Sequence, residues 1–189
     1  MSLRAEIARA ILPVPKALRV EADEYVFTLA AATGGLALLP LALTFYRQHE
    51  GSLYNAAARS VKGLRHKQMV LGVLVDSLQA ELPRHGVPAA AVCCVVQIPK
   101  AEADQLRLML DGGSPLETVR TENMIYRIMH GDAPLKHRLF RWVTMVPACV
   151  LPPRTFYAAR RWLTEQSWYQ VARKRTVPVP GITRVEIDR

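Results

Sequence analysis

The chain has 189 residues, half of them apolar and 22% charged, which excludes a disordered composition and leaves enough material for a buried core. Lysine and arginine outnumber aspartate and glutamate by 25 to 16, and the formal charge is +9. Such a charge favours anionic partners, namely nucleic acid, anionic lipid or phosphorylated substrates, although it can also serve solubility alone. The three cysteines, Cys93, Cys94 and Cys149, have neither a disulfide framework nor metal-ligand spacing, so we expect a reducing, cytoplasmic compartment.

The first third of the chain consists of short apolar pieces separated by glycine and proline. Residues 26–46 contain no charge over 21 positions, which is long enough on paper to cross a bilayer. Gly34-Gly35 and Pro40 divide this run, so we expect a helix over residues 25–33 followed by two short buried strands at 36–39 and 43–46. The sequence therefore predicts a small α/β part at the N-terminus.

The middle of the chain is typical of amphipathic helices. Apolar residues at helical spacing predict a helix over residues 60–85, a short helix over 89–96 and a third over 101–110. Cys93 and Cys94 lie in the apolar stretch 89–96, where we expect buried, unreactive thiols. Ser114, Pro115 and Glu117 have the spacing of a capping box, which predicts a further helix from there to residue 129.

The last third mixes basic residues with aromatic and aliphatic ones. Two helices are expected, over residues 135–146 and 154–169, and residues 176–189, with Pro178 and Pro180, look extended. Basic and apolar residues combined on helices suit an anionic membrane surface. The alternative is a pair of helices packed on the core with their arginine faces in water.

Two short groups of residues could carry chemistry. Asp23 and Glu24 open the first apolar helix, where the helix dipole favours carboxylates. Arg47 and His49 are two residues apart, so on an extended backbone they point to the same side and could engage a phosphate or a metal. Taken singly, the first pair is explained by helix capping and the second by a strand end.

The order and spacing of these groups resemble the acceptor-side half of family 2 glycosyltransferases of the GT-A fold. In that family an acidic pair opens a helix, and an arm of the type apolar-Pro-x-x-Leu-x-x-Tyr-Arg-x-His follows it. Here the pair is Asp23-Glu24 and the arm runs from Leu39-Pro40 to His49. The resemblance covers about residues 11–55, and the helical remainder is similar to the C-terminal extensions of some members.

The resemblance implies roles for both groups. One acid of the pair would be the general base that deprotonates the acceptor hydroxyl in an inverting sugar transfer. The order is Asp-Glu here and usually Glu-Asp in the family, so either acid could take the role, and alignment on Tyr25 favours Glu24. His49 would lie near the donor diphosphate or its metal, with Arg47 as its cationic neighbour. The implied cofactors are a divalent cation, Mg or Mn, and a nucleotide-sugar donor.

The chain departs from the family where the donor would bind. It has no Asp-x-Asp and no glycine-rich phosphate loop, and only 22 residues precede Asp23. On this interpretation a separate donor-binding chain would have to complete the enzyme. We therefore expect a mainly α protein with an acceptor-side remnant at residues 1–55, a helical extension at 56–175 and an extended tail at 176–189.

A rival interpretation needs no catalysis. The chain would be a basic helical protein that binds anionic membrane surfaces, at the inner face of the membrane, or a protein partner. A nucleic-acid partner is not expected, because the basic residues are spread along the chain and form no recognisable motif.

Overall fold

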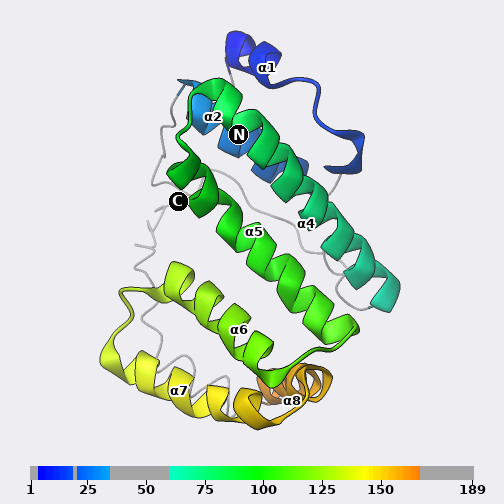
Figure 1. The fold of residues 1–189 in the computed structure, drawn as a ribbon, viewed down its shortest axis with the longest axis vertical. Helices are drawn as coiled ribbons and strands as arrows, with labels where there is room; N and C mark the ends of the chain where they lie inside the picture. Colours follow the sequence, from blue (N-terminus) through cyan, green and yellow to red (C-terminus); the bar gives the residue numbers. More distant parts are fainter. Residues whose placement is uncertain (1–3, 19–20, 35–59, 167–189) are drawn as a thin grey trace, which may run out of the picture. The chain divides into compact units, whose positions relative to one another are not determined.

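The computed structural model describes residues 4–18, 21–34 and 60–166, and these residues are mainly helical, which confirms the predicted mainly α class (Figure 1). They form seven α-helices and two short 3-10 helices, and no strand occurs within these ranges. The chain divides into two compact units, Met1–Leu110 and Asp111–Arg189. Each unit is described by itself.

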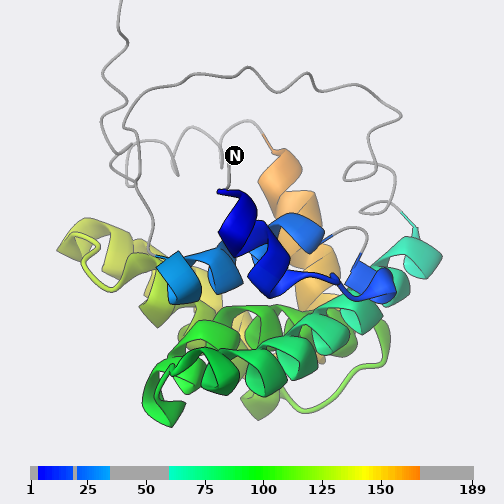
Figure 2. The ribbon, with the colours of Figure 1, turned by 90° about the horizontal axis from the view of Figure 1, so that it is seen from above.

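Unit 1 is built on a hairpin of two long helices, α4 (Val61–Glu81) and α5 (Ala89–Leu110), which lie side by side in Figures 1 and 2. The 3-10 helix η2 (Leu82–His85) joins them, and Gly86 closes the turn with a φ of 78°. Glycine suits this position because a Cβ would strain a left-handed backbone.

Three shorter helices complete unit 1. They are α1 (Ala5–Ile11), the 3-10 helix η1 (Lys16–Leu18) and α2 (Ala22–Gly34). All of them contribute to one apolar core with α4 and α5, because each presents a few large side chains at helical spacing. The fully buried members include Leu18, Leu29, Val70, Leu71, Leu74 and Leu78.

Two predictions for α5 are wrong. The helix is continuous through Pro99, where we expected two separate helices. Val92, Val96 and Leu106 lie on one face on both sides of the proline and all join the core, and their burial outweighs the one lost backbone hydrogen bond. Cys93 and Cys94 are exposed, because they lie on the side of α5 that faces away from this core.

Part of the predicted N-terminal α/β region is described. The helix expected over residues 25–33 is confirmed as α2 and begins three residues earlier. The strands expected at 36–39 and 43–46 lie outside the described residues, and so do the expected domain boundaries at 55 and 175. The described part of this region is helical, so it gives the predicted GT-A-like region no support.

Unit 2 contains α6 (Pro115–His130), α7 (Leu135–Val150) and α8 (Pro153–Glu165). The predicted capping box is confirmed at the start of α6. The Ser114 hydroxyl oxygen accepts from the Glu117 backbone N–H at 3.2 Å, and the Ser114 N–H donates to the Glu117 carboxylate at 3.0 Å. α7 continues past Pro147, which we had expected to end it, and the expected end of α8 at residue 169 lies outside the described residues.

Within the ranges that the structure describes, no helix combines the length and the apolar character needed to cross a membrane.

Candidate functional site

The structure describes one half of the constellation suggested by the sequence. Asp23 and Glu24 lie in the first turn of α2, as predicted, and both side chains are exposed. Carboxylates in this position are stabilised by the helix dipole whatever else they do. Arg47 and His49, the other half, lie outside the described residues.

A buried acid that we had not singled out lies next to this pair. Glu21 is only 7% exposed, and its Oε1 has no hydrogen-bond partner among the described residues. Burial raises the pKa of the Glu21 carboxyl, the positive charge of Lys67 lowers it, and Asp23 and Glu102 raise it further. Lys67 forms an ion pair with Glu102, with 3.4 Å between Nζ and Oε2.

The pKa of Glu24 is raised in the same way. Desolvation of its carboxyl is the main cause, the negative charges of Glu21, Glu102 and Asp23 add to it, and Lys67 opposes them. The described ranges contain no group of three or more side chains that could hold a metal ion.

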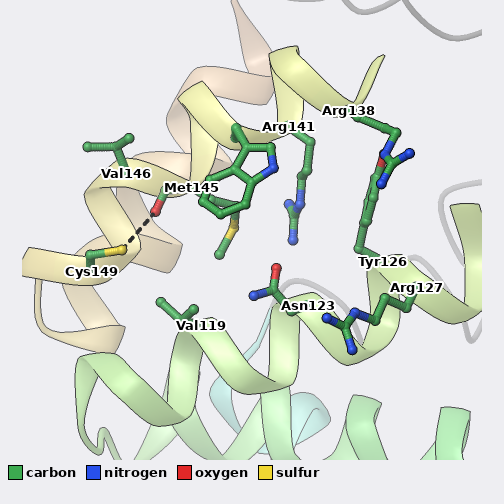
Figure 3. A pocket seen from close by; sticks show the side chains of 10 residues that line it. Val119, Asn123, Tyr126, Arg127, Arg138, Arg141, Met145, Val146 and Cys149 are labelled. Carbon is green, nitrogen blue, oxygen red and sulfur yellow. Dashed lines mark hydrogen bonds between the residues drawn. The ribbon is translucent and has the colours of Figure 1, made fainter. Parts of the chain in front are cut away.

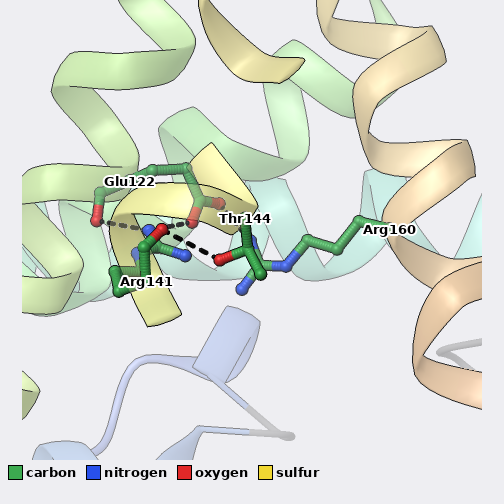
Figure 4. A network of polar contacts seen from close by, with 4 residues as sticks. All are labelled: Glu122, Arg141, Thr144 and Arg160. Carbon is green, nitrogen blue, oxygen red and sulfur yellow. Dashed lines mark hydrogen bonds and ion pairs between the residues drawn. The ribbon is translucent and has the colours of Figure 1, made fainter. Parts of the chain in front are cut away.

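The polar centre of unit 2 is the carboxylate of Glu122 on α6, which is buried to 1% exposure (Figure 4). Arg141 of α7 donates to one of its oxygens at 2.7 Å, and Arg160 of α8 donates to the other at 2.6 Å. The Arg141 guanidinium also donates to the Glu122 backbone carbonyl at 3.1 Å. One acid thus joins all three helices of the unit through charge-assisted hydrogen bonds.

This network determines which side of α7 faces inward. His137 and Arg141 on the inward side are polar, and both are largely buried. Apolar residues spaced four or three apart occupy the opposite side and are 57–76% exposed. We call these residues the apolar stripe: Leu135, Leu139, Trp142, Val143, Val146 and Val150. α7 therefore presents its apolar side to its surroundings, the reverse of an ordinary amphipathic surface helix.

Positive charge borders the apolar stripe. Lys136 and Arg138 flank it on α7, both exposed, and α7 contains no acidic residue. Of the arginines expected to lie in water, Arg138 of α7 does so, but the same helix also contains an arginine that does not. Its Arg141 points inward to Glu122, and the side facing outward is apolar.

A cavity of about 280 Å³ lies between α6 and α7 (Figure 3). Its cationic members are Arg127, Arg138 and Arg141, and Asn123 and Tyr126 add polar groups. The remaining wall is apolar or weakly polar and consists of Val119, Trp142, Met145, Val146 and Cys149. Trp142 and Val146 belong to both the cavity and the apolar stripe, so the two features are continuous.

The arginines of this cavity differ in their pairing. Arg141 is bound to Glu122, but its Nε is buried and has no hydrogen-bond partner. Arg127 and Arg138 are exposed, and neither has an ion-pair or hydrogen-bond partner among the residues that the structure describes. A smaller cavity of about 160 Å³ between α7 and α8 is different, since both of its arginines, Arg141 and Arg160, bind Glu122.

Sequence reasoning missed Glu122 and the inward roles of Arg141 and Arg160. One available signal was Thr118, one turn before Glu122 and also fully buried, because the two together give α6 a polar face. That pattern predicts a polar helix face but cannot tell whether the face lies in water or meets two arginines.

We expect Glu21→Gln to stabilise the protein at neutral pH. Because the pKa of the Glu21 carboxyl is raised in the folded state, its protonated form contributes stability at pH values below its ordinary pKa of 4.5. This contribution is lost as the pH rises through the folded-state pKa. The variant cannot ionise, so its free energy of unfolding should exceed that of wild type at pH 7 and match it near pH 4. Urea unfolding at both pH values measures this, with Glu6→Gln, at an exposed acid, as the control. A less stable Glu21→Gln protein at pH 7 would contradict the burial argument.

We expect Glu122→Gln to destabilise unit 2 by about 3 kcal/mol, because it leaves the buried Arg141 guanidinium without its anion. The measurement is urea unfolding followed by a probe in unit 2, such as tryptophan fluorescence. Asp132→Asn is the matched control, since it also converts an acid to an amide but at an exposed position between α6 and α7. Equal stability of the two variants would show that the carboxylate does not hold the helices together.

Comparisons of the chain with protein-family models, with curated proteins and with solved structures found no match.

Proposed function

We propose that the chain is a non-catalytic, basic helical protein that binds anionic membrane surfaces through the apolar stripe of α7. The single observation that carries the proposal is the orientation of this helix. The six apolar residues of the stripe are 57–76% exposed, while Arg141 on the opposite side of the helix binds Glu122 and His137 is buried.

The composition of the stripe favours a lipid surface. Trp142 lies in its middle, and tryptophan is the residue most suited to the boundary between acyl chains and headgroups. Lys136 and Arg138 lie beside it, where they would meet anionic headgroups. α7 has 16 residues and is therefore about 24 Å long, which suits a helix that lies in the membrane interface.

The glycosyltransferase hypothesis stays a prediction from the resemblance. Two observations agree with it: Asp23 and Glu24 are in the first turn of α2, and the pKa of Glu24 is raised. The hypothesis also requires a nucleotide-sugar donor, a Mg or Mn ion and a separate donor-binding chain. The residues that would meet the donor, Arg47 and His49, lie outside the described residues.

We expect Leu139→Glu with Val143→Glu to weaken binding to anionic vesicles about a hundredfold, because two apolar side chains would no longer leave water. Flotation with vesicles containing phosphatidylglycerol measures the affinity, at low and at high salt. Binding should fall with salt and should be weak on vesicles of neutral lipid.

The matched control carries the same added charge elsewhere. Val61→Glu with Met69→Glu changes two exposed apolar residues of α4, 65% and 58% exposed, and should leave vesicle binding close to that of wild type after allowance for net charge. Absence of wild-type binding to anionic vesicles would overturn the proposal. If wild type does not bind vesicles but forms a dimer that Leu139→Glu with Val143→Glu dissociates, the stripe is a protein interface.

A further inference from the structure

The cavity between α6 and α7 brings positive charge and apolar surface together at the edge of the apolar stripe (Figure 3). From this arrangement we infer that the cavity binds the phosphate of a phosphomonoester lipid headgroup. The inference rests on the proposed function, because the stripe would bring the cavity to the headgroup layer.

The first argument is charge. Arg127 on α6 and Arg138 on α7 have no partner among the described residues, and both line the cavity. A phosphomonoester carries about −1.5 to −2 charges at neutral pH, which matches two guanidinium groups better than the single charge of a phosphodiester or a carboxylate. Arginine also binds phosphate oxygens in pairs through its planar fork of N–H groups.

The second argument is hydrogen bonding in the cavity wall. The Nε of Arg141 is a buried donor without a partner, although Nη2 of the same guanidinium group donates to Glu122. In Figure 3 the Arg141 side chain extends from α7 toward Asn123 on α6, so a fixed guanidinium group and a side-chain amide approach the same space. Because Glu122 holds Arg141 in place, little ordering would be needed when a ligand binds.

The third argument is the apolar part of the wall. Trp142 and Val146 continue from the cavity onto the apolar stripe. A ligand whose phosphate lies between the arginines could therefore extend its glycerol and acyl parts along surface that would otherwise stay exposed. The volume of about 280 Å³ is slightly below that of a site for a drug-sized molecule, as expected for a headgroup whose tail stays outside. A free inorganic phosphate would leave this apolar wall in water.

The test compares two lipids at the same surface charge. Vesicles with phosphatidic acid, a phosphomonoester, and vesicles with phosphatidylglycerol, a phosphodiester, are adjusted to equal measured surface potential. We expect wild type to bind the phosphatidic acid vesicles about tenfold more tightly, the equivalent of one additional charge-assisted contact. Equal affinity for the two lipids would overturn this inference and leave the proposed function intact.

Two double variants with the same change in net charge test which arginines produce the preference for phosphatidic acid. Arg127→Gln with Arg138→Gln should abolish the preference for phosphatidic acid. Arg120→Gln with Arg161→Gln, at exposed positions that do not line the cavity, should weaken binding to both lipids but keep the preference. Loss of the preference in both pairs would show that net charge, rather than the cavity, is responsible and would overturn the assignment.

Inorganic phosphate distinguishes the lipid from a soluble ligand. At constant ionic strength, millimolar phosphate should leave the preference for phosphatidic acid unchanged, because inorganic phosphate has no apolar part to pack against the apolar wall of the cavity. The lipid concentration is set to half-saturate the wild-type protein. If phosphate then abolishes the preference for phosphatidic acid, the acyl part contributes nothing to binding and the lipid assignment is wrong. If wild type binds no anionic vesicle of any kind, the proposed function fails as well.

Discussion

The placement of α7 depends on one buried carboxylate. Glu122 lies in the interior of unit 2, and leaving its charge there without partners would cost several kcal/mol. Arg141 and Arg160 meet that requirement from two different helices, at 2.7 and 2.6 Å. Since Arg141 is on α7, the ion pair directs the polar side of this helix inward. The apolar side is left facing outward, and a helix with that orientation needs something apolar to contact.

The exposed surface that results has two components with different physical roles. The apolar stripe provides area whose removal from water is favourable and does not depend on salt. Lys136, Arg138 and Arg127 provide attraction to negative charge, which raises the concentration of the protein near an anionic surface and weakens as salt is added. Neither component holds a protein firmly on a membrane by itself, and their combination on one helix pair is what makes an anionic lipid surface the best-matched partner.

The sequence predicts local features of this fold better than orientations. The capping box at Ser114 and Glu117 placed the start of α6 correctly, because its signal lies within four residues. The gap predicted between the helices at 89–96 and 101–110 is absent, since burial of Val96 and Leu106 on either side of it depends on contacts with α4 that the local sequence does not contain. The amphipathic character of α7 was visible from its spacing, but periodicity is the same whichever side faces inward. The partnership of Arg141 with Glu122, 19 residues away, supplies the information that periodicity lacks. For the candidate site, Asp23 and Glu24 were placed correctly at a helix start, and the burial of the neighbouring Glu21 had no local signal.

The most direct test is the depth of Trp142 in a bound membrane. The chain has three tryptophans, so Trp162→Phe with Trp168→Phe leaves Trp142 as the sole tryptophan fluorophore. The measurement is quenching of its fluorescence by phosphatidylglycerol vesicles with bromine atoms on the upper part of the acyl chains. If the outward apolar stripe is the membrane-binding surface, Trp142 should be strongly quenched on brominated vesicles and not on unbrominated ones. Binding to the vesicles without quenching of Trp142 would contradict the account, because another surface would then make the contact.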